Sequence, residues 1–356
     1  MVKWVGKIIL LGVLLVLSGC AAISEPDYAV NSNGDEDAAL SAMDQNYLLS
    51  YERVVENALP VMDTDNTVGA RLMAASLKLS IDDEIEKIKN SASLVVINNL
   101  NVSKAVADWF IQNEIRVYQY RCSVTGNELN KIYNTLCVLD KKYICKDIYF
   151  ADSLPGKNSL GLDTVGFGGS EAILLKIGIY DNWTIAHENG HYIDFGVIGD
   201  LSAGFKDISW ERNGTSRKNW GFISPYAYTS PAEDFADSVA FFTMGDKKFK
   251  DIGNLLDAIG YSPVNKKYEW IKNNVFKKTF NRNESPVKYW QLAIKNRFIP
   301  MIKEMRNEKL KEIEKEYPVK GVSVWTKIKN TAKREFYEKL TKAKFGAVIE
   351  LLGLVD

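Results

Sequence analysis

The placement of the histidines constrains this chain more than any other feature. The 356 residues include only two histidines, and both lie in the segment His187-Glu188-Asn189-Gly190-His191. Chance would place two histidines four residues apart, with glutamate after the first, in roughly one such chain in three thousand. Coincidence is therefore a poor explanation, and the pattern indicates a histidine pair that works together.

The residues around this segment favour an α-helix. Asp181 is suited to be the N-cap residue, and Gly196 is a candidate stop at the C-terminal end. On a helix the two histidines project from one face, one turn apart. Two neutral imidazoles at that spacing can bind one Zn²⁺ at about 2.0 to 2.1 Å, and Glu188 can act on a bound water. The alternative is a structural role, in which the histidines only pack around or cap a helix.

A catalytic zinc usually has three protein ligands, so a third ligand must come from elsewhere in the chain. Since no other histidine exists, that ligand must be a carboxylate or a thiolate. The longer motif with histidine at position 197 is excluded, because Val197 stands there. Downstream, Ser230 is a plausible N-cap and Pro231 suits the first helical position. A helix that begins there places Glu233 and Asp237 one turn apart on one face.

Together these segments resemble the anthrax lethal factor and Pro-Pro endopeptidase family of zinc metallopeptidases. The pattern His-Glu-x-Gly-His-x-x-Asp occupies 187–194, and the pattern Tyr-x-x-x-x-x-x-Glu-x-Phe-Ala-acidic occupies 226–237. The resemblance implies one zinc ion per chain, a peptide or protein substrate, and an α+β zincin-like domain with extra flanking helices. The implied roles are His187, His191 and Glu233 as zinc ligands, Glu188 as general base and acid, Tyr226 as the phenol that steadies the oxyanion, and Asp194 and Asp237 as acidic groups that orient the ligands or the helix.

Two positions depart from the family pattern. Asn189 stands where the family usually has an apolar residue, and Asp234 stands where it often has an aromatic residue. Neither position supplies a metal ligand, so the implied chemistry is unaffected. Tyr228 is a rival for the oxyanion role because it lies only two residues from Tyr226. The family spacing favours Tyr226.

The region before the motif predicts a small α+β domain. Strands are expected at 94–97, 115–120, 147–150 and 173–177, and helices at 103–111 and 127–139. In zinc peptidases of this architecture the strand before the motif helix commonly lies at a sheet edge and pairs with extended substrate. Residues 173–177 are the candidate for that role. The glycine-rich segment 161–170 is expected to be a loop or an irregular hairpin. It could close over the cleft, but a plain connecting role is favoured.

Composition and missing motifs exclude two classes of partner. Basic and acidic residues balance at 45 each, so the chain lacks the basic footprint of a nucleic-acid binder. The stretch that contains Gly166, Gly168 and Gly169 has no G-x-x-x-x-G-K-[ST] pattern, and no dinucleotide-binding unit frames it. We therefore expect neither nucleic acid nor nucleotide to bind.

The first residues resemble a targeting segment. Two lysines precede the apolar run 8–17, which is too short to span a membrane comfortably, and Leu17-Ser18-Gly19-Cys20 resembles the bacterial lipobox. We expect a lipidated Cys20 that anchors the chain outside the cytoplasm, at the cell surface or outer membrane of a bacterium. An ordinary signal peptide or a short anchor is the alternative. Without residues 1–19 the chain has 43 basic and 45 acidic residues, a net charge of −2, so the lipid rather than a polybasic patch would hold it at the membrane.

Composition and periodicity also suggest the domain organisation. Downstream of Pro231 the apolar spacing is helical, and the alternating Lys and Glu of 303–315 fit a solvated helical face. The predicted parts are a signal peptide at 1–19, a lipidated cysteine and flexible tether at 20–45, an N-terminal helical region at 46–90, a zincin-like metallopeptidase domain at 91–282 and a C-terminal helical region at 283–356.

Three cysteines remain after Cys20. Cys122, Cys137 and Cys145 allow at most one internal disulfide, and the sequence does not say which pair would form it. Their spacing lacks the close C-x-x-C pairing of structural zinc sites. Buried thiols or one bridge are therefore expected.

Three functions stay open at the level of sequence. They are a zinc endopeptidase, a zinc-binding lipoprotein without catalysis, and an interaction lipoprotein with a degenerate site. Glu188 favours the first over the second, because a binding site needs ligands but no carboxylate directly after the first histidine. An interaction lipoprotein with a degenerate site is expected to bind no stoichiometric zinc.

Overall fold

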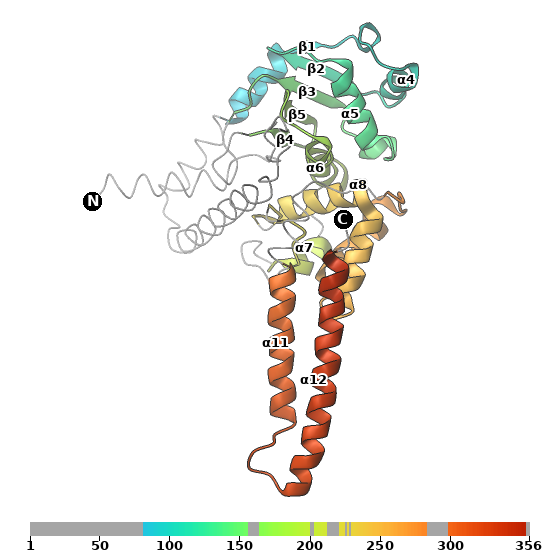
Figure 1. The fold of residues 1–356 in the computed structure, drawn as a ribbon. Coiled ribbons are helices and arrows are strands. Elements are labelled where there is room, and N and C mark those ends of the chain that lie inside the picture. The colour runs from blue at the N-terminus through green and yellow to red at the C-terminus, as the bar shows by residue number, and fades with distance from the viewer. Residues whose placement is uncertain are drawn as a thin grey trace, which may run out of the picture. The chain divides into compact units, whose positions relative to one another are not determined.

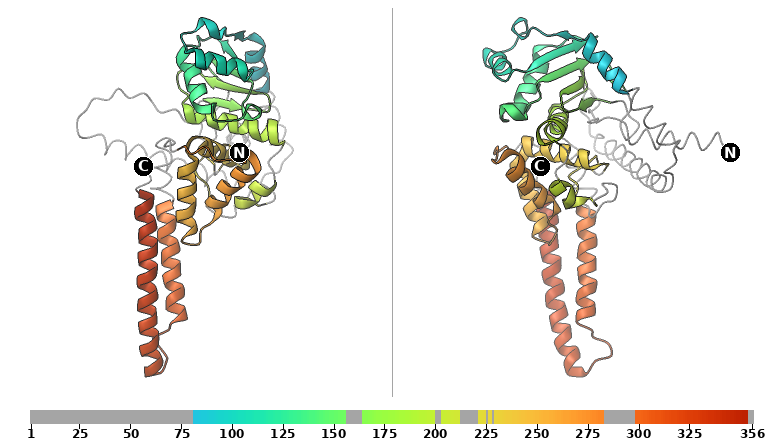
Figure 2. Two further views of the ribbon diagram at one scale, coloured as in Figure 1. Left: turned by 90° about the vertical axis from the view of Figure 1, so that its right-hand side faces the viewer. Right: turned by 180° about the vertical axis from the view of Figure 1, so that it is seen from behind.

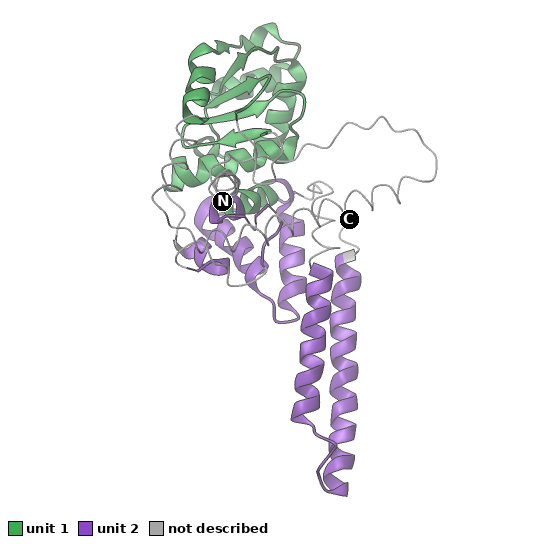
Figure 3. Ribbon diagram, turned by 90° about the vertical axis from the view of Figure 1, so that its left-hand side faces the viewer, with its two compact units in different colours: residues 1–202, 235–243 green, residues 203–234, 244–356 purple. Residues whose placement is uncertain are grey.

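The computed structural model describes residues 81–155, 164–199, 203–211, 221–224, 226–227, 229–282 and 298–353. The predicted signal peptide, Cys20, the tether, most of the 46–90 region and Tyr228 lie outside the described residues. The chain divides into two compact units, one of Met1–Ser202 with Phe235–Thr243 and one of Ala203–Asp234 with Met244–Asp356 (Figure 3). The predicted domain at 91–282 therefore spans parts of both units. No helix in the described ranges is long and apolar enough to cross a bilayer.

The described part of the first unit contains a mixed five-stranded sheet (Figure 1). The sheet order is β1-β2-β3-β5-β4, with β2, β3 and β5 parallel and with β1 and β4 antiparallel to their neighbours. The strands are β1 (Ser93–Leu94), β2 (Arg116–Tyr120), β3 (Asp147–Ala151), β4 (Gly166–Gly168) and β5 (Ala172–Lys176). These bounds confirm the strands predicted at 115–120, 147–150 and 173–177. The strand predicted at 94–97 is shorter, because a 3-10 turn at Ile97–Asn99 follows it.

Helices cover both faces of this sheet. The helical residues 81–91 and helix α5 (Gly126–Leu136) lie on opposite sides of it (Figures 1 and 2). Ile88 packs with Tyr149 and Leu174 on one face, as expected from the two-residue alternation along a strand. Helix α4 (Lys104–Gln112) precedes β2, and helix α6 (Asn182–Tyr192) follows β5. The mixed α+β class is confirmed.

The edge-strand prediction for residues 173–177 is wrong. Strand β5 is internal, since it pairs with β3 on one side and with β4 on the other. The edge is β4, whose Gly166 lies opposite Leu175 and whose Gly168 lies opposite Ile173. The sequence allowed a loop or an irregular hairpin here, and the antiparallel pairing of β4 with β5 confirms the hairpin. Glycine weakens strand propensity, so a regular strand was not expected.

The second unit is mainly helical in the ranges that the structure describes. Helix α8 contributes Phe235–Thr243 to the first unit and the rest of its length to the second, with a kink at Gly245. Helices α11 and α12 pack together as an antiparallel hairpin (Figures 1 and 2). The helices are α7 (Ala203–Ser209), α8 (Pro231–Asp257), α9 (Pro263–Trp270) with a π-helical turn at Ile271–Phe276, α11 (Ile299–Glu316) and α12 (Val324–Gly353). The helical prediction downstream of Pro231 is confirmed for these ranges.

The three cysteines of the described ranges form no disulfide. Cys137 is exposed, Cys122 is half-buried and Cys145 is buried. Burial raises the pKa of the Cys145 thiol to about 12. That thiol is therefore protonated at neutral pH and behaves as a small apolar side chain.

Candidate metal centre

Local sequence explains where the motif helix α6 begins and ends. The N-cap prediction for Asp181 is confirmed, because its carboxylate accepts the Thr184 N–H at 2.8 Å while the Thr184 hydroxyl accepts the Asp181 N–H at 3.3 Å. The predicted stop at Gly196 is wrong. The chain continues as a π-helical turn over Ile193–Ile198 and ends at Gly199, whose φ is 73°. Gly196 instead allows a close contact with Ser170, since a Cβ at position 196 would lie 2.5 Å from the Ser170 backbone oxygen.

Three side chains of the motif form one buried group. His187, Glu188 and His191 are each fully buried, and one ligand atom from each lies within 4.8 Å of the others. The Nε2 atoms of the two histidines are 3.2 Å apart. Two nitrogens that each lie about 2.0 to 2.1 Å from one tetrahedral zinc are separated by about 3.4 Å. The donor set therefore fits a bound metal ion.

Asp237 fixes the ring of the first histidine. His187 Nδ1 lies 2.7 Å from Asp237 Oδ1, and the two side chains are 1% and 2% exposed. A carboxylate at this distance accepts the Nδ1–H, so the lone pair of the neutral ring is on Nε2. That is the nitrogen that faces His191.

Gly190 explains how α8 comes close enough for this contact. A Cβ on Gly190 would lie 2.9 Å from both the Cα and the carbonyl oxygen of Ala236. Real Cβ atoms essentially never approach that closely, so only glycine permits this approach of α6 to α8. The residue after Ala236 is Asp237, which contacts His187. Glycine costs about 1 kcal/mol of helix propensity relative to alanine, and the close packing offsets that cost.

Strand β4 lies directly against the motif. A Cβ on Gly166 would be 2.4 Å from Glu188 Oε1, and a Cβ on Gly168 would be 2.3 Å from the Glu188 backbone oxygen and 2.8 Å from His191 Cβ. At Gly169 the nearest atom would be 3.8 Å away, which is ordinary contact. The two glycines of β4 are therefore required at the site. Sequence reasoning missed them, although a Gly-x-Gly beside a strand is a signal of close backbone approach.

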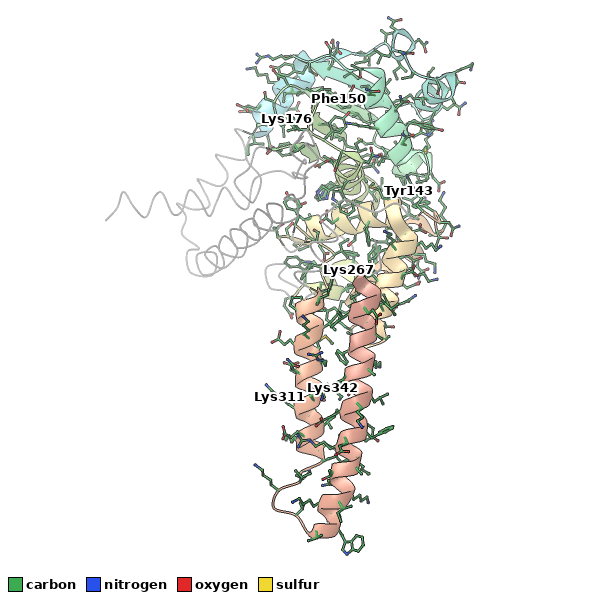
Figure 4. All side chains as sticks on the ribbon, in the orientation of Figure 1. Tyr143, Phe150, Lys176, Lys267, Lys311 and Lys342 are labelled. Atoms are coloured by element: carbon green, nitrogen blue, oxygen red, sulfur yellow. The ribbon has the colours of Figure 1, made fainter. Side chains whose placement is uncertain are left out.

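Asn189 joins α6 to the chain before β3. Its Nδ2 donates to the Tyr143 carbonyl at 2.8 Å, and its Oδ1 accepts the Cys145 N–H at 3.0 Å. All three groups are buried, and Figure 4 labels Tyr143. Asn189 therefore has a structural role, because an apolar residue in its place would leave those two backbone groups without these partners.

Glu233 and Tyr226 lie in the second unit. The predicted helix start is confirmed, because Ser230 is the N-cap of α8, its hydroxyl accepts the Glu233 N–H at 3.2 Å, and Pro231 occupies the first turn. Tyr226 is buried, and its carbonyl accepts both the N–H and the hydroxyl of Thr229. Neither residue is a member of the three-residue group described above.

Asp234 belongs to a buried ion pair in the second unit. Lys267 Nζ lies 2.6 and 2.8 Å from the two Asp234 oxygens and 2.6 Å from the Gly221 carbonyl. Trp210 Nε1 donates to Asp234 Oδ2 at 3.0 Å. Both charged side chains are fully buried. The network holds the first turn of α8, which also carries Glu233.

Asp194 lies in the π-helical turn, three residues after His191. Its side chain is fully buried, and its backbone carbonyl accepts the Gly199 N–H at 3.0 Å, which closes the turn.

No second cluster of potential metal ligands occurs in the described part of the chain. Comparisons with protein-family models, with curated proteins and with solved structures find no match to this chain. Function is therefore inferred from the site itself.

Proposed function

We propose that this protein is a zinc metalloendopeptidase with a zincin-like catalytic domain. The observation that carries the proposal is the buried Glu188 carboxylate beside two imidazoles whose Nε2 atoms are 3.2 Å apart. A site that only stores a metal needs ligands, whereas this one also has an acid–base group next to the ligands. Peptide hydrolysis by a metal-activated water uses that combination.

His187 and His191 would hold the zinc ion through Nε2. Glu233 is the proposed third ligand, because it lies one helical turn before Asp237 on α8 and so projects from the face that contacts His187. A carboxylate ligand fits a chain without a third histidine. Zinc, when bound, supplies Lewis acidity that lowers the pKa of water to about 7.

Glu188 would take the proton from the attacking water and deliver it to the leaving amine. Tyr226 would donate its phenol hydrogen to the substrate carbonyl oxygen as that oxygen gains negative charge. Asp237 keeps His187 in the tautomer that binds metal through Nε2, and Asp194 would support the helix behind His191. No covalent intermediate with the protein is required.

An extended peptide is the proposed form of the substrate. Strand β4 is an edge strand of the described sheet, and it packs directly on Glu188. Pairing of a peptide with this edge would place a scissile bond along the strand that borders the site. We therefore propose β4, rather than residues 173–177, as the edge strand that pairs with the substrate.

A lipid on Cys20 is the proposed membrane anchor. It would keep the catalytic domain outside the cytoplasm, joined to the bilayer through the polar tether at 20–45. Intact-mass measurement of the membrane-extracted protein tests this anchor. A mature chain whose mass shows no lipid on Cys20 would refute it.

Metal analysis combined with a peptide library tests the enzyme proposal. The chain from Ala21 onward should bind one zinc and cleave peptides, and Glu188→Gln should keep the zinc while losing turnover. Equal cleavage by the two proteins would refute the catalytic role of Glu188. A wild type that binds zinc but cleaves nothing would indicate a zinc-binding protein without catalysis.

The third ligand has its own test. Glu233→Ala should lose most of its zinc, whereas Asp251→Ala, an exposed acid on the same helix, should keep it. Full zinc affinity in the Glu233 variant would refute this ligand and direct attention to Asp194 or Asp237.

A further inference from the structure

Helix α12 exposes a stripe of large apolar side chains. Trp325, Ile328, Phe336 and Leu340 are 84%, 59%, 60% and 54% exposed. At about 100° per residue, these four residues fall within about 120° of the helix circumference and extend about 22 Å along its axis. We call them the apolar stripe. Contiguous exposed apolar surface of this kind marks an interaction site more often than an ordinary solvated face.

The opposite side of α12 is the one that packs in the hairpin. Phe345, Val348 and Leu352 are buried, and helical periodicity places them about 140° to 200° from Trp325. Arg334 on the same side pairs with Glu314 of α11 at 3.0 Å. Two views of the hairpin show α11 along one side of α12 (Figure 2). The apolar stripe is therefore not part of the core of the hairpin.

Basic residues surround the apolar stripe. Residues 324–344 include seven Lys or Arg and only two Glu, whereas α11 has five basic and five acidic residues. Lys329, Lys333 and Lys339 lie within about 80° of the centre of the stripe. None of these three lysines takes part in an ion pair with another described residue. The balanced charge of the whole chain conceals this local excess.

We propose that the apolar stripe and its lysines bind an anionic lipid bilayer. Exposed Trp, Phe, Ile and Leu on one face enter the boundary between headgroups and acyl chains, and flanking lysines reach the lipid phosphates. Trp325, at the start of α12, has the amphipathic ring that is enriched at this boundary. Membrane contact through α12 would require neither a lipid on Cys20 nor a metal ion bound at α6.

Charge complementarity favours a bilayer over a second copy of the chain. Two copies that joined through the apolar stripe would bring two sets of lysines together, and each helix segment carries a formal excess of five positive charges. Like charges at such an interface are unfavourable, whereas an anionic surface complements them. The four residues of the apolar stripe are all aliphatic or aromatic, which suits acyl chains.

Vesicle sedimentation tests the proposal with the chain from Ala21 onward, which carries neither a lipid nor the apolar run 8–17. Vesicles of phosphatidylglycerol and phosphatidylcholine should bind the protein, and vesicles of phosphatidylcholine alone should bind it much more weakly. Lys329→Gln, Lys333→Gln and Lys339→Gln together should lower the partition coefficient about a hundredfold, at about fivefold per lysine. Higher salt should also weaken binding.

The matched control changes three exposed lysines of α11, namely Lys303, Lys311 and Lys315, to glutamine (Figure 4 labels Lys311). It removes the same total charge, so it should change binding by less than about tenfold. Circular dichroism of both triple variants checks that the hairpin stays helical. Equal binding to neutral vesicles, no binding at all, or an equal loss in both triple variants would overturn the proposal.

A depth measurement separates insertion from loose electrostatic attraction. Brominated lipids should quench part of the tryptophan fluorescence of the wild type, and Trp325→Phe should remove most of that quenching while the stripe stays apolar. Unchanged quenching in Trp325→Phe would overturn insertion of the stripe. Concentration-dependent dimerisation that Trp325→Ala abolishes, without vesicle binding, would assign the stripe to a second copy of the chain instead.

Discussion

Replacing Gly166 with alanine tests whether strand β4 holds the Glu188 carboxylate in place. The new Cβ would lie 2.4 Å from Glu188 Oε1 and 2.8 Å from its Cγ and Cδ. Ordinary contact begins at 3.4 Å, so the carboxylate has to retreat by about 1 Å. Because Oε1 is the far end of a flexible side chain, the carboxylate moves rather than the strand.

The expected effect is on catalysis more than on stability. A misplacement of about 1 Å in a reacting group costs about a hundredfold in rate, which is about 2.7 kcal/mol in the activation barrier. Zinc binding should be nearly unchanged, because the three atoms nearest the new methyl group all belong to Glu188 and none to His187 or His191. Gly168→Ala differs, since its Cβ would be 2.3 Å from a backbone oxygen of α6. Overpacking against backbone should destabilise the fold by about 1 to 3 kcal/mol.

The assay measures three quantities for each variant, namely zinc content, kcat on a peptide selected with the wild type, and Tm. Gly169→Ala is the matched control, because its Cβ would have no neighbour nearer than 3.8 Å. We expect Gly166→Ala to keep zinc and Tm but lose kcat, Gly168→Ala to lose Tm, and Gly169→Ala to resemble the wild type. A fully active Gly166→Ala protein would show that Glu188 is not positioned by β4.

Three further predictions concern buried groups. Asp237→Asn should lower zinc affinity about 10- to 100-fold, measured by competition with a chelator, because the carboxylate that orients His187 is lost. Lys267→Met should destabilise the protein by about 3 to 5 kcal/mol in denaturant unfolding, since it leaves Asp234 buried without its cation. Alkylation at pH 8 should modify the exposed Cys137 quickly and Cys145 only after unfolding, because the pKa of Cys145 is raised to about 12 and its thiol is buried.

Two of these predictions have a control variant, and the third has a result that would contradict it. Asp251→Asn, on the exposed side of α8, should leave zinc affinity unchanged. The double variant Lys267→Met with Asp234→Leu should recover part of the lost stability, because no unpaired charge remains buried. Equal alkylation rates for Cys137 and Cys145 in the folded protein would contradict the burial of the second thiol.

Much of the candidate site could be predicted from local pattern. The histidine pair and Glu188 lie within five consecutive residues of one helix. The Asp181 cap and the Ser230 cap each depend on a residue three positions away. Contacts of this range depend only on the chain near each residue. For the same reason, the strands of alternating or continuous apolar residues and the helices of 3.6-residue period were predictable.

Two features near the motif depended on residues far from them in the chain. Gly196 was expected to end the motif helix, but the helix passes it as a π-helical turn and ends at Gly199. Residues 161–170 were expected to be a loop or an irregular hairpin, and the antiparallel pairing of Gly166–Gly168 with β5 confirms the hairpin and supplies the edge strand. In both cases glycine allows a close approach to another segment, and local propensity contains no information about that segment.

The sequence by itself determined the chemistry of this protein: two imidazoles and a carboxylate at helical spacing, in a chain with no other histidine. Only the tertiary structure decided how that chemistry is held. It brought Asp237 to His187 through Gly190, and it placed Gly166 and Gly168 against Glu188 and His191. Periodicity along one helix fixes which side chains share a face, whereas the partners of that face come from packing between segments far apart in the chain.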